Sequence, residues 1–247
     1  MIKKILLTII ILITVGLVFF FIVDEPVPQG KKGKEAELLA DKMLNAINYD
    51  DWQNTEIIAW EFPGGHLHTW DKKRHFARVQ WDDYTVVFQI DSLKGLAYKN
   101  GEQVSSSEAS DLIQTAWEYW ANDSFWLNAP AKIRDGGTER QLVELENGEQ
   151  ALLVLYHGGG VTPGDKYLWG LDENHLPVYC KMWVSIIPVG GVKFSWEDWQ
   201  TLSTGAKIAQ SHKGIIGLEL KNIRAGKTVR ALFPESDPFS ELDSYLN

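Results

Sequence analysis

The sequence has few of the residues that mark several large classes of function. Its 247 residues include one cysteine, Cys180, so no disulfide can form within the chain. Cys180 alternates with apolar neighbours, which predicts a buried structural thiol on a strand rather than a nucleophile. The Gly-x-Ser-x-Gly elbow of esterases is also missing. The glycines after His157 therefore predict a long turn and not an oxyanion loop.

Positive charge is scarce as well. The chain carries 24 Lys and Arg against 33 Asp and Glu. Without Lys3 and Lys4, 22 basic residues remain against the same 33 acidic ones, a net charge of −11. A nucleic-acid partner requires a basic face that neutralises phosphates, so this class is excluded. No motif indicates a cofactor.

The longest apolar run lies at the N-terminus. The 19 residues from Ile5 to Val23 contain no charge and would span roughly 28 Å as a helix, close to a hydrocarbon core of about 30 Å. A cleaved signal peptide is the alternative, but the run ends Phe-Phe-Phe-Ile-Val without a small-residue cleavage site. We therefore expect residues 1–23 to be an uncleaved membrane anchor.

The lysines beside this run set its expected orientation. Lys3 and Lys4 lie closest to the run and come first, which favours a cytoplasmic N-terminus. The expected location is thus the bacterial inner membrane, with a single span and the remaining domain in the periplasm. Residues 24–34 are rich in Pro, Gly and Lys and predict a flexible tether, and residues 35–247 are long enough for one domain.

The periodicity of the domain predicts a mainly β, α+β fold. Helical spacing of apolar residues covers 34–48 and 107–122, and an apolar loop is expected over 124–130. Alternating runs predict antiparallel strands over 55–62, 66–71, 75–81, 84–91, 139–145, 150–157, 166–172, 177–187, 192–202 and 214–223. About ten strands, with one helix before them and one inserted, suggest a curved antiparallel sheet or incomplete β-barrel over the helices.

Tryptophan is the most distinctive residue of the chain, with eleven copies outside the apolar N-terminal run. Large rigid aromatic side chains suit apolar ligands, although most of them should pack in the core. We expect the best candidates for a cavity mouth in the second helix and the loop after it. The candidate ligand-binding residues are Trp117, Trp120, Trp126, Trp60, Trp169 and Tyr167.

A weaker candidate site rests on two histidines. His66 and His68 alternate on a predicted strand, so both imidazoles point to one face and could bind zinc or copper. A third ligand would have to come from His75, His157 or Asp71. The alternative is a pair of exposed polar residues on an edge strand.

Three segments carry a resemblance to a known group of proteins. They are Phe125–Asp135 (FWLNAPAKIRD), Gly159–Tyr167 (GGVTPGDKY) and the aromatic run Trp196–Leu202 that leads into Thr204–Ile208. Together they resemble an uncharacterised family of bacterial envelope proteins, best known from Bacteroidota. The fold of that family is similar to that of the outer-membrane lipoprotein carriers.

The resemblance covers roughly residues 57–223. It implies an incomplete antiparallel barrel wrapped over helices, with a cavity for acyl chains. The uncleaved anchor departs from the carriers, because the carrier itself is soluble and its receptor is lipidated.

Three functions remain open at this point. The first is a non-enzymatic, membrane-tethered envelope domain that binds a hydrophobic or lipid-like ligand in a half-barrel cavity. The second is an envelope interaction or scaffold domain with a filled barrel. The third is a metal-dependent hydrolase that uses His66 and His68.

Overall fold

The computed structural model describes residues 24–158 and 164–246, and the expected anchor lies outside these residues. The described chain is mainly β, with antiparallel strands in three sheets and a few helices. Among these residues, no helix combines the length and the apolar character needed to cross a bilayer.

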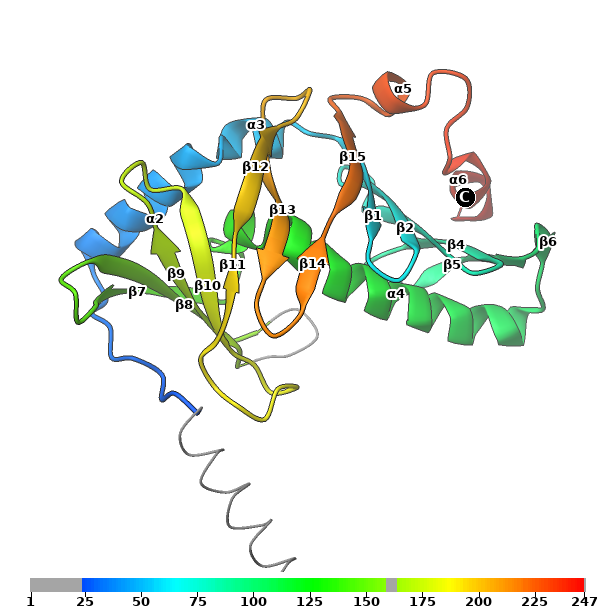
Figure 1. The fold of residues 1–247 in the computed structure, drawn as a ribbon. Coiled ribbons are helices and arrows are strands. Elements are labelled where there is room, and N and C mark those ends of the chain that lie inside the picture. The colour runs from blue at the N-terminus through cyan, green and yellow to red at the C-terminus, as the bar shows by residue number, and fades with distance from the viewer. Residues whose placement is uncertain (1–23, 159–163, 247) are drawn as a thin grey trace, which may run out of the picture.

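The largest sheet has seven strands in the order β15-β1-β2-β3-β4-β5-β6 (Figure 1). Apart from β15, it is a simple meander in which each strand pairs with the next one along the chain. The strands are β1 (Ile57–Phe62), β2 (His66–Asp71), β3 (Phe76–Trp81), β4 (Tyr84–Gln89), β5 (Lys94–Lys99), β6 (Glu102–Gln103) and β15 (Lys221–Gly226).

The second sheet has the order β11-β10-β9-β8-β7, and the third has the order β12-β13-β14. The second sheet contains β7 (Thr138–Glu144), β8 (Gln150–Tyr156), β9 (Lys166–Leu171), β10 (Pro177–Trp183) and β11 (Val192–Ser195). The third contains β12 (Glu197–Thr201), β13 (Lys207–Lys213) and β14 (Gly217–Glu219). Strand β8 lies inside its sheet, and its residues Ala151–Val154 are buried.

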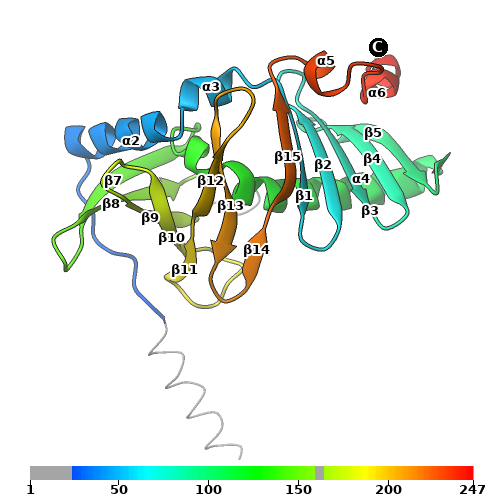
Figure 2. The same ribbon diagram turned by 45° about the horizontal axis from the view of Figure 1, so that its top comes forward.

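Two single residues join the three sheets. Trp196 separates β11 from β12, and its backbone N–H donates to the carbonyl of Val178 at 2.9 Å. Leu220 separates β14 from β15, and its N–H donates to the carbonyl of Gln210 at 2.8 Å. Both side chains are buried. The sheets therefore follow one another along two bent strands and form a continuous curved surface (Figure 2).

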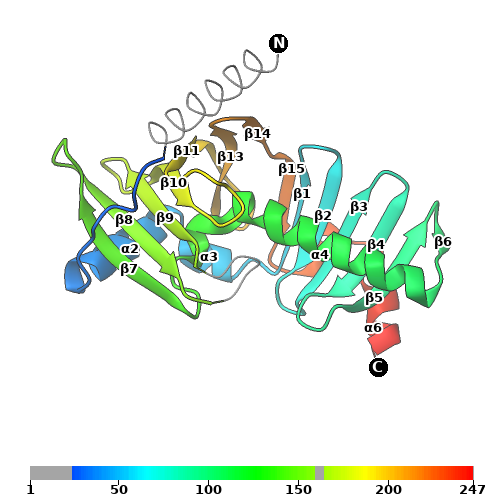
Figure 3. The ribbon, with the colours of Figure 1, turned by 90° about the horizontal axis from the view of Figure 1, so that it is seen from below.

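One long helix crosses the underside of this surface. Helix α4 (Ser106–Asn128) runs from the β5–β6 end beneath the first sheet and reaches the second and third sheets (Figure 3). The helix begins where Ser105 accepts a hydrogen bond from the N–H of Glu108. A 3₁₀ turn, η1 (Ala129–Lys132), continues it past Asn128.

The other helices lie at the rim of the molecule. They are α2 (Lys34–Ala46), α3 (Tyr49–Gln53), α5 (Val229–Leu232) and α6 (Ser240–Leu246). Helix α2 buries Leu39, Met43 and Leu44 in the main core, which it shares with the last turns of α4 and the second and third sheets. The first half of α4 forms a second core with β3, β4 and β5.

The structure confirms the mainly β antiparallel class and refines the expected single sheet. The described strands number fifteen and fall into three sheets instead of one sheet of ten strands. The sequence did not predict β5, β6, α5 or α6. It also predicted one strand over 214–223, whereas the structure has β14 and β15 there and a separate strand, β13, before them.

The apolar loop expected over 124–130 is wrong. Residues 124–128 are the last turns of α4, and 129–132 form η1. Nearly every side chain from Asp123 to Ala131 is buried. The segment therefore has no solvent-exposed face, and its sequence lacks the alternation of apolar and polar residues that indicates a surface helix.

The residues expected to form a tether lie against the second sheet. Lys31 pairs with Leu142 of β7 through two backbone hydrogen bonds of 2.8 and 2.9 Å. Lys32 also forms an ion pair with Glu139 at 2.5 Å.

The bend at Leu220 should be essential for stability. We expect Leu220→Ala to lower the free energy of unfolding by about 2–5 kcal/mol, because it opens a cavity at a fully buried position. Leu67→Ala on the half-exposed face of β2 is the control and should change it by less than about 0.5 kcal/mol. Urea unfolding of the full-length chain, followed by tryptophan fluorescence, measures both, and equal losses would contradict the assignment.

Candidate functional site

An apolar hollow of the described chain lies between the last turns of α4 and strands β8, β9 and β10. Its volume is about 550 Å³. Helix α4 and η1 contribute Phe125, Trp126 and Ala129 to one wall. The facing wall and the rim are formed by Tyr156, Tyr167, Met182, Val184, Ile186 and Ile187.

A small number of polar groups line the same cavity. The Tyr167 hydroxyl donates to Asp165 Oδ2 at 2.9 Å, and the Tyr156 hydroxyl donates to the carbonyl of Lys132 at 3.2 Å. Burial raises the pKa of both tyrosines well above its ordinary value, so both remain protonated donors. Burial also raises the pKa of Asp135, which forms an ion pair with Lys132 at 3.7 Å.

The rim of the cavity is connected to the first described residues of the chain. Ile186 lies in the loop between β10 and β11 and is 72% exposed. In the same loop, the N–H of Gly190 donates to Asp24 Oδ1 at 2.7 Å, and its carbonyl accepts from the N–H of Glu25 at 3.2 Å. The point at which the chain enters the domain is therefore fixed beside the cavity rim.

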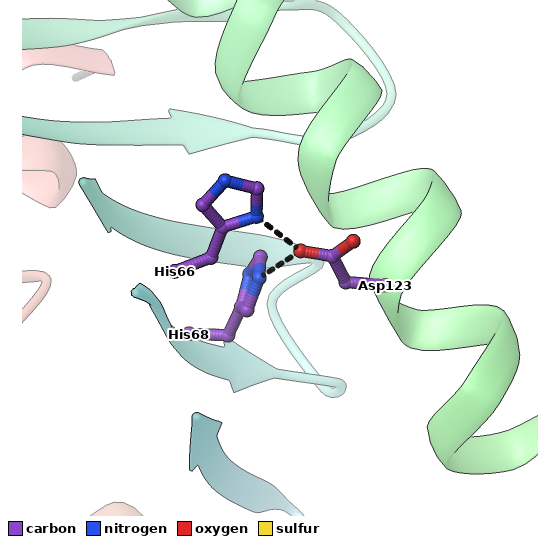
Figure 4. Close-up of side chains that lie close together, drawn as sticks. All are labelled: His66, His68 and Asp123. Atoms are coloured by element: carbon purple, nitrogen blue, oxygen red, sulfur yellow. Dashed lines mark hydrogen bonds and ion pairs between the residues drawn. The ribbon is translucent and has the colours of Figure 1, made fainter. Parts of the chain in front are cut away.

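A polar cluster lies on the other side of α4, facing β2. Alternation along β2 places His66 and His68 on one face, as predicted, and Asp123 projects toward them from α4 (Figure 4). His66 Nδ1 and His68 Nε2 each donate to the same oxygen, Asp123 Oδ2, at 2.7 Å. We call these three residues the His–Asp cluster.

The His–Asp cluster is largely closed to solvent. The side chains of His68 and Asp123 are 0% and 1% exposed, whereas that of His66 is 18% exposed. Trp60 stacks on His68 with ring centroids 4.5 Å apart, and Tyr119 stacks on His66 at 4.0 Å. Burial lowers the pKa of His68, although Asp123 opposes the shift. Its Nδ1 has no hydrogen-bond partner within the described chain.

The structure places the six candidate aromatic residues in different surroundings. Trp126 and Tyr167 line the cavity. Trp169 is buried against Trp196, at 5.0 Å between ring centroids, and Trp60 stacks on His68. Trp120 packs against Trp70 at 5.3 Å, and Trp117 packs in the core formed by the first half of α4.

Asp123 was not among the third ligands that the sequence suggested for His66 and His68. His75 pairs with Asp91 at 2.9 Å, and Asp71 pairs with Arg74 at 2.8 Å. His157 lies 3.6 Å from Glu139. The available signal was Asp123 itself, which lies between the aromatic residues Trp120 and Phe125, but the segment after 122 was expected to be a loop.

A second hollow, of about 690 Å³, lies near α5. Glu56, Lys73, Arg74, Arg230, Glu235 and Asp237 contribute to its lining. Arg74 is already paired with Asp71, Asp237 and Asp243 at 2.5–2.8 Å. Charged side chains take part in its lining and pair with one another, so the cavity beneath α4, with its aromatic and aliphatic walls, is the better candidate for an apolar ligand.

Comparisons with known proteins give little further identification. No model of a known protein family matches the sequence, and no curated protein matches it. Among solved structures, the chain is similar to a DUF1329 family protein from Desulfovibrio piger, with a TM-score of 0.40 and 10% identity over 86% of this chain and 99% of that one. The resemblance to an envelope family stays a prediction.

A buried histidine behind the cavity wall should make stability depend on pH. His212 lies between Trp126 and Trp196, and its Nδ1 donates to the carbonyl of Ser195 at 3.3 Å. Burial lowers its pKa from 6.5 to about 4. Between these values the unfolded chain binds a proton that the folded chain does not bind. Stability should therefore fall as the pH drops from 6.5 to 4, by roughly 1 kcal/mol per pH unit from this group.

Urea unfolding of the wild-type chain and His212→Gln across this pH range tests the effect. The slope of stability against pH should be smaller in the variant than in the wild type. Identical slopes in the two proteins would show that His212 does not titrate as described.

Proposed function

We propose that this chain is a membrane-tethered envelope domain that binds a hydrophobic or lipid-like ligand, without catalysis, in the cavity beneath α4. The observation that carries the proposal is the cavity of about 550 Å³ with its apolar walls. This volume lies within the range of about 300–1,000 Å³ that is typical of small-molecule sites. Helix α4, the turn η1 and strands β8, β9 and β10 form most of the walls, and the β10–β11 loop completes the rim.

The lining of the cavity favours an apolar ligand over a polar one. Phe125, Trp126, Met182, Val184 and Ile187 provide side chains without charge. Transfer of each methylene group from water to such surroundings is favourable by about 0.8 kcal/mol. The tyrosine hydroxyls, Asp165 and the Lys132–Asp135 pair supply the few polar groups that would orient the polar end of an amphiphile.

The position of the rim supports a membrane as the source of the ligand. Ile186 is exposed at the rim, and Gly190 of the same loop binds Asp24, which directly follows the apolar run 5–23. With that run inserted in the inner membrane and the domain in the periplasm, the rim would lie close to the bilayer surface. An exposed isoleucine at this place suits contact with lipid.

A titration with saturated fatty acids tests the proposal. The full-length chain in a mild detergent should bind them with an affinity that rises about fourfold per added methylene until the cavity is full. Ala121→Trp introduces a large side chain into the lining and should weaken binding at least tenfold. The change in tryptophan fluorescence and native mass spectrometry measure binding.

Ser110→Trp, at an exposed position in the first half of α4, is the matched control and should bind like the wild type. If affinity does not depend on chain length, or if both tryptophan variants behave alike, the ligand does not occupy this cavity.

An envelope scaffold domain is the second candidate, and one observation favours it. Ile215 and Ile216 in the turn between β13 and β14 are 76% and 60% exposed. This turn lies at the same end of the molecule as the β10–β11 loop (Figure 1), whose Gly190 is hydrogen-bonded to Asp24. An apolar tip beside the chain entry would also suit another membrane-associated protein.

A further inference from the structure

We infer that the His–Asp cluster is a binding site for one divalent transition-metal ion, with zinc as the representative of the class. The inference does not depend on the proposed lipid ligand, because His66, His68 and Asp123 do not line the cavity. It rests on the convergence of three ligand atoms from two elements that are distant in the sequence.

The donor atoms have the chemistry and spacing that such an ion requires. His66 Nδ1, His68 Nε2 and one carboxylate oxygen of Asp123 all lie within 4.8 Å of one another. Zinc binds imidazole nitrogen at about 2.0–2.1 Å and carboxylate oxygen at about 2.0–2.2 Å, so neighbouring donors around a tetrahedral ion are roughly 3.4 Å apart. The present nitrogen-to-oxygen distances of 2.7 Å would have to increase by less than about 1 Å.

The backbone already holds these donors in place. Residues 66 and 68 are two apart on β2, so the strand itself aims both imidazoles at α4. The ring of His68 is fixed by Trp60, and the ring of His66 lies against Tyr119 (ring centroids 4.5 and 4.0 Å apart). Asn122 donates to Asp123 Oδ1 at 2.9 Å, which orients the carboxylate and leaves Oδ2 toward the histidines.

The charge of Asp123 is the second argument. Its side chain is 1% exposed, and no Lys or Arg nitrogen of the described chain lies within 4.0 Å of its carboxylate. Buried carboxylates are normally paired with a cation or bound to a metal, because an isolated charge in an apolar interior is costly. A divalent ion bound by Asp123 and two imidazoles supplies the missing positive charge.

The cluster also has an open side. His66 is partly exposed and follows directly after the β1–β2 turn at Gly64 and Gly65. Three protein ligands would leave a fourth position of a tetrahedral ion on this side, for water or another small ligand. The bound ion would connect β2 to α4 and so stabilise the contact between the first sheet and the long helix.

Metal binding to the full-length chain tests the inference directly. The protein is purified in detergent without a histidine tag, stripped with a chelator, and titrated with Zn²⁺ by calorimetry and with Co²⁺ by absorption. We expect about one ion per chain, a Co²⁺ spectrum of nitrogen and oxygen ligands without thiolate bands, and a rise in Tm with Zn²⁺ concentration.

The variant Asp123→Asn should weaken Zn²⁺ binding at least tenfold and remove the rise in Tm. Asp91→Asn at the exposed His75–Asp91 pair is the matched control and should leave both unchanged. If Asp123→Asn does not fold, His66→Gln at the open edge replaces it, with the same expected loss.

Two results would overturn the inference. One is a wild-type chain that binds no stoichiometric Zn²⁺ and gives no Co²⁺ spectrum, which would make the cluster a hydrogen-bonded contact only. The other is unchanged binding in both variants of the cluster. Fatty-acid binding is measured separately on the same proteins. A chain that binds fatty acids but no metal, or metal but no fatty acids, would therefore contradict only one of the two proposals.

Discussion

The packing of α4 beneath the curved strand surface is the contact on which the rest of the molecule depends. The first half of the helix forms one core with β3, β4 and β5, and its last turns enter a second core with α2 and the other two sheets. Bent strands at Trp196 and Leu220 connect the three sheets. A helix of 23 residues that spans these bends therefore fixes the angles between the sheets.

The same helix positions both candidate sites. Successive residues of the helix turn by about 100°, so Asp123 faces away from Asn122 and Trp126, which lie four residues apart on one side of the helix. Asn122 and Trp126 line the apolar cavity, whereas Asp123 faces His66 and His68. Asn122 also donates to Asp123, so one hydrogen bond connects the lining of the cavity to the His–Asp cluster.

The sequence predicted the helices and strands that have one solvent-exposed and one buried face. The alternation over residues 66–71 and the helical stripe of 34–48 appeared as β2 and α2. The prediction was wrong where burial is complete, since the residues after Asn122 have no polar face to reveal a helix. The spacing of His66 and His68 along a strand predicted that they share a face. Asp123 lies 55 residues after His68, and it comes close only because α4 packs against β2.

The contact between Asp24 and Gly190 limits how the domain can be attached to anything that precedes it. A chain that enters through a free linker can present any side of its domain. Here the entry point is held by hydrogen bonds at Asp24 and Glu25, in the loop that also carries Ile186. The hydrogen bonds of Asp24 and Glu25 thus set the direction from which the chain enters the domain. Whatever lies on the N-terminal side meets the cavity rim first and the far β5–β6 end last.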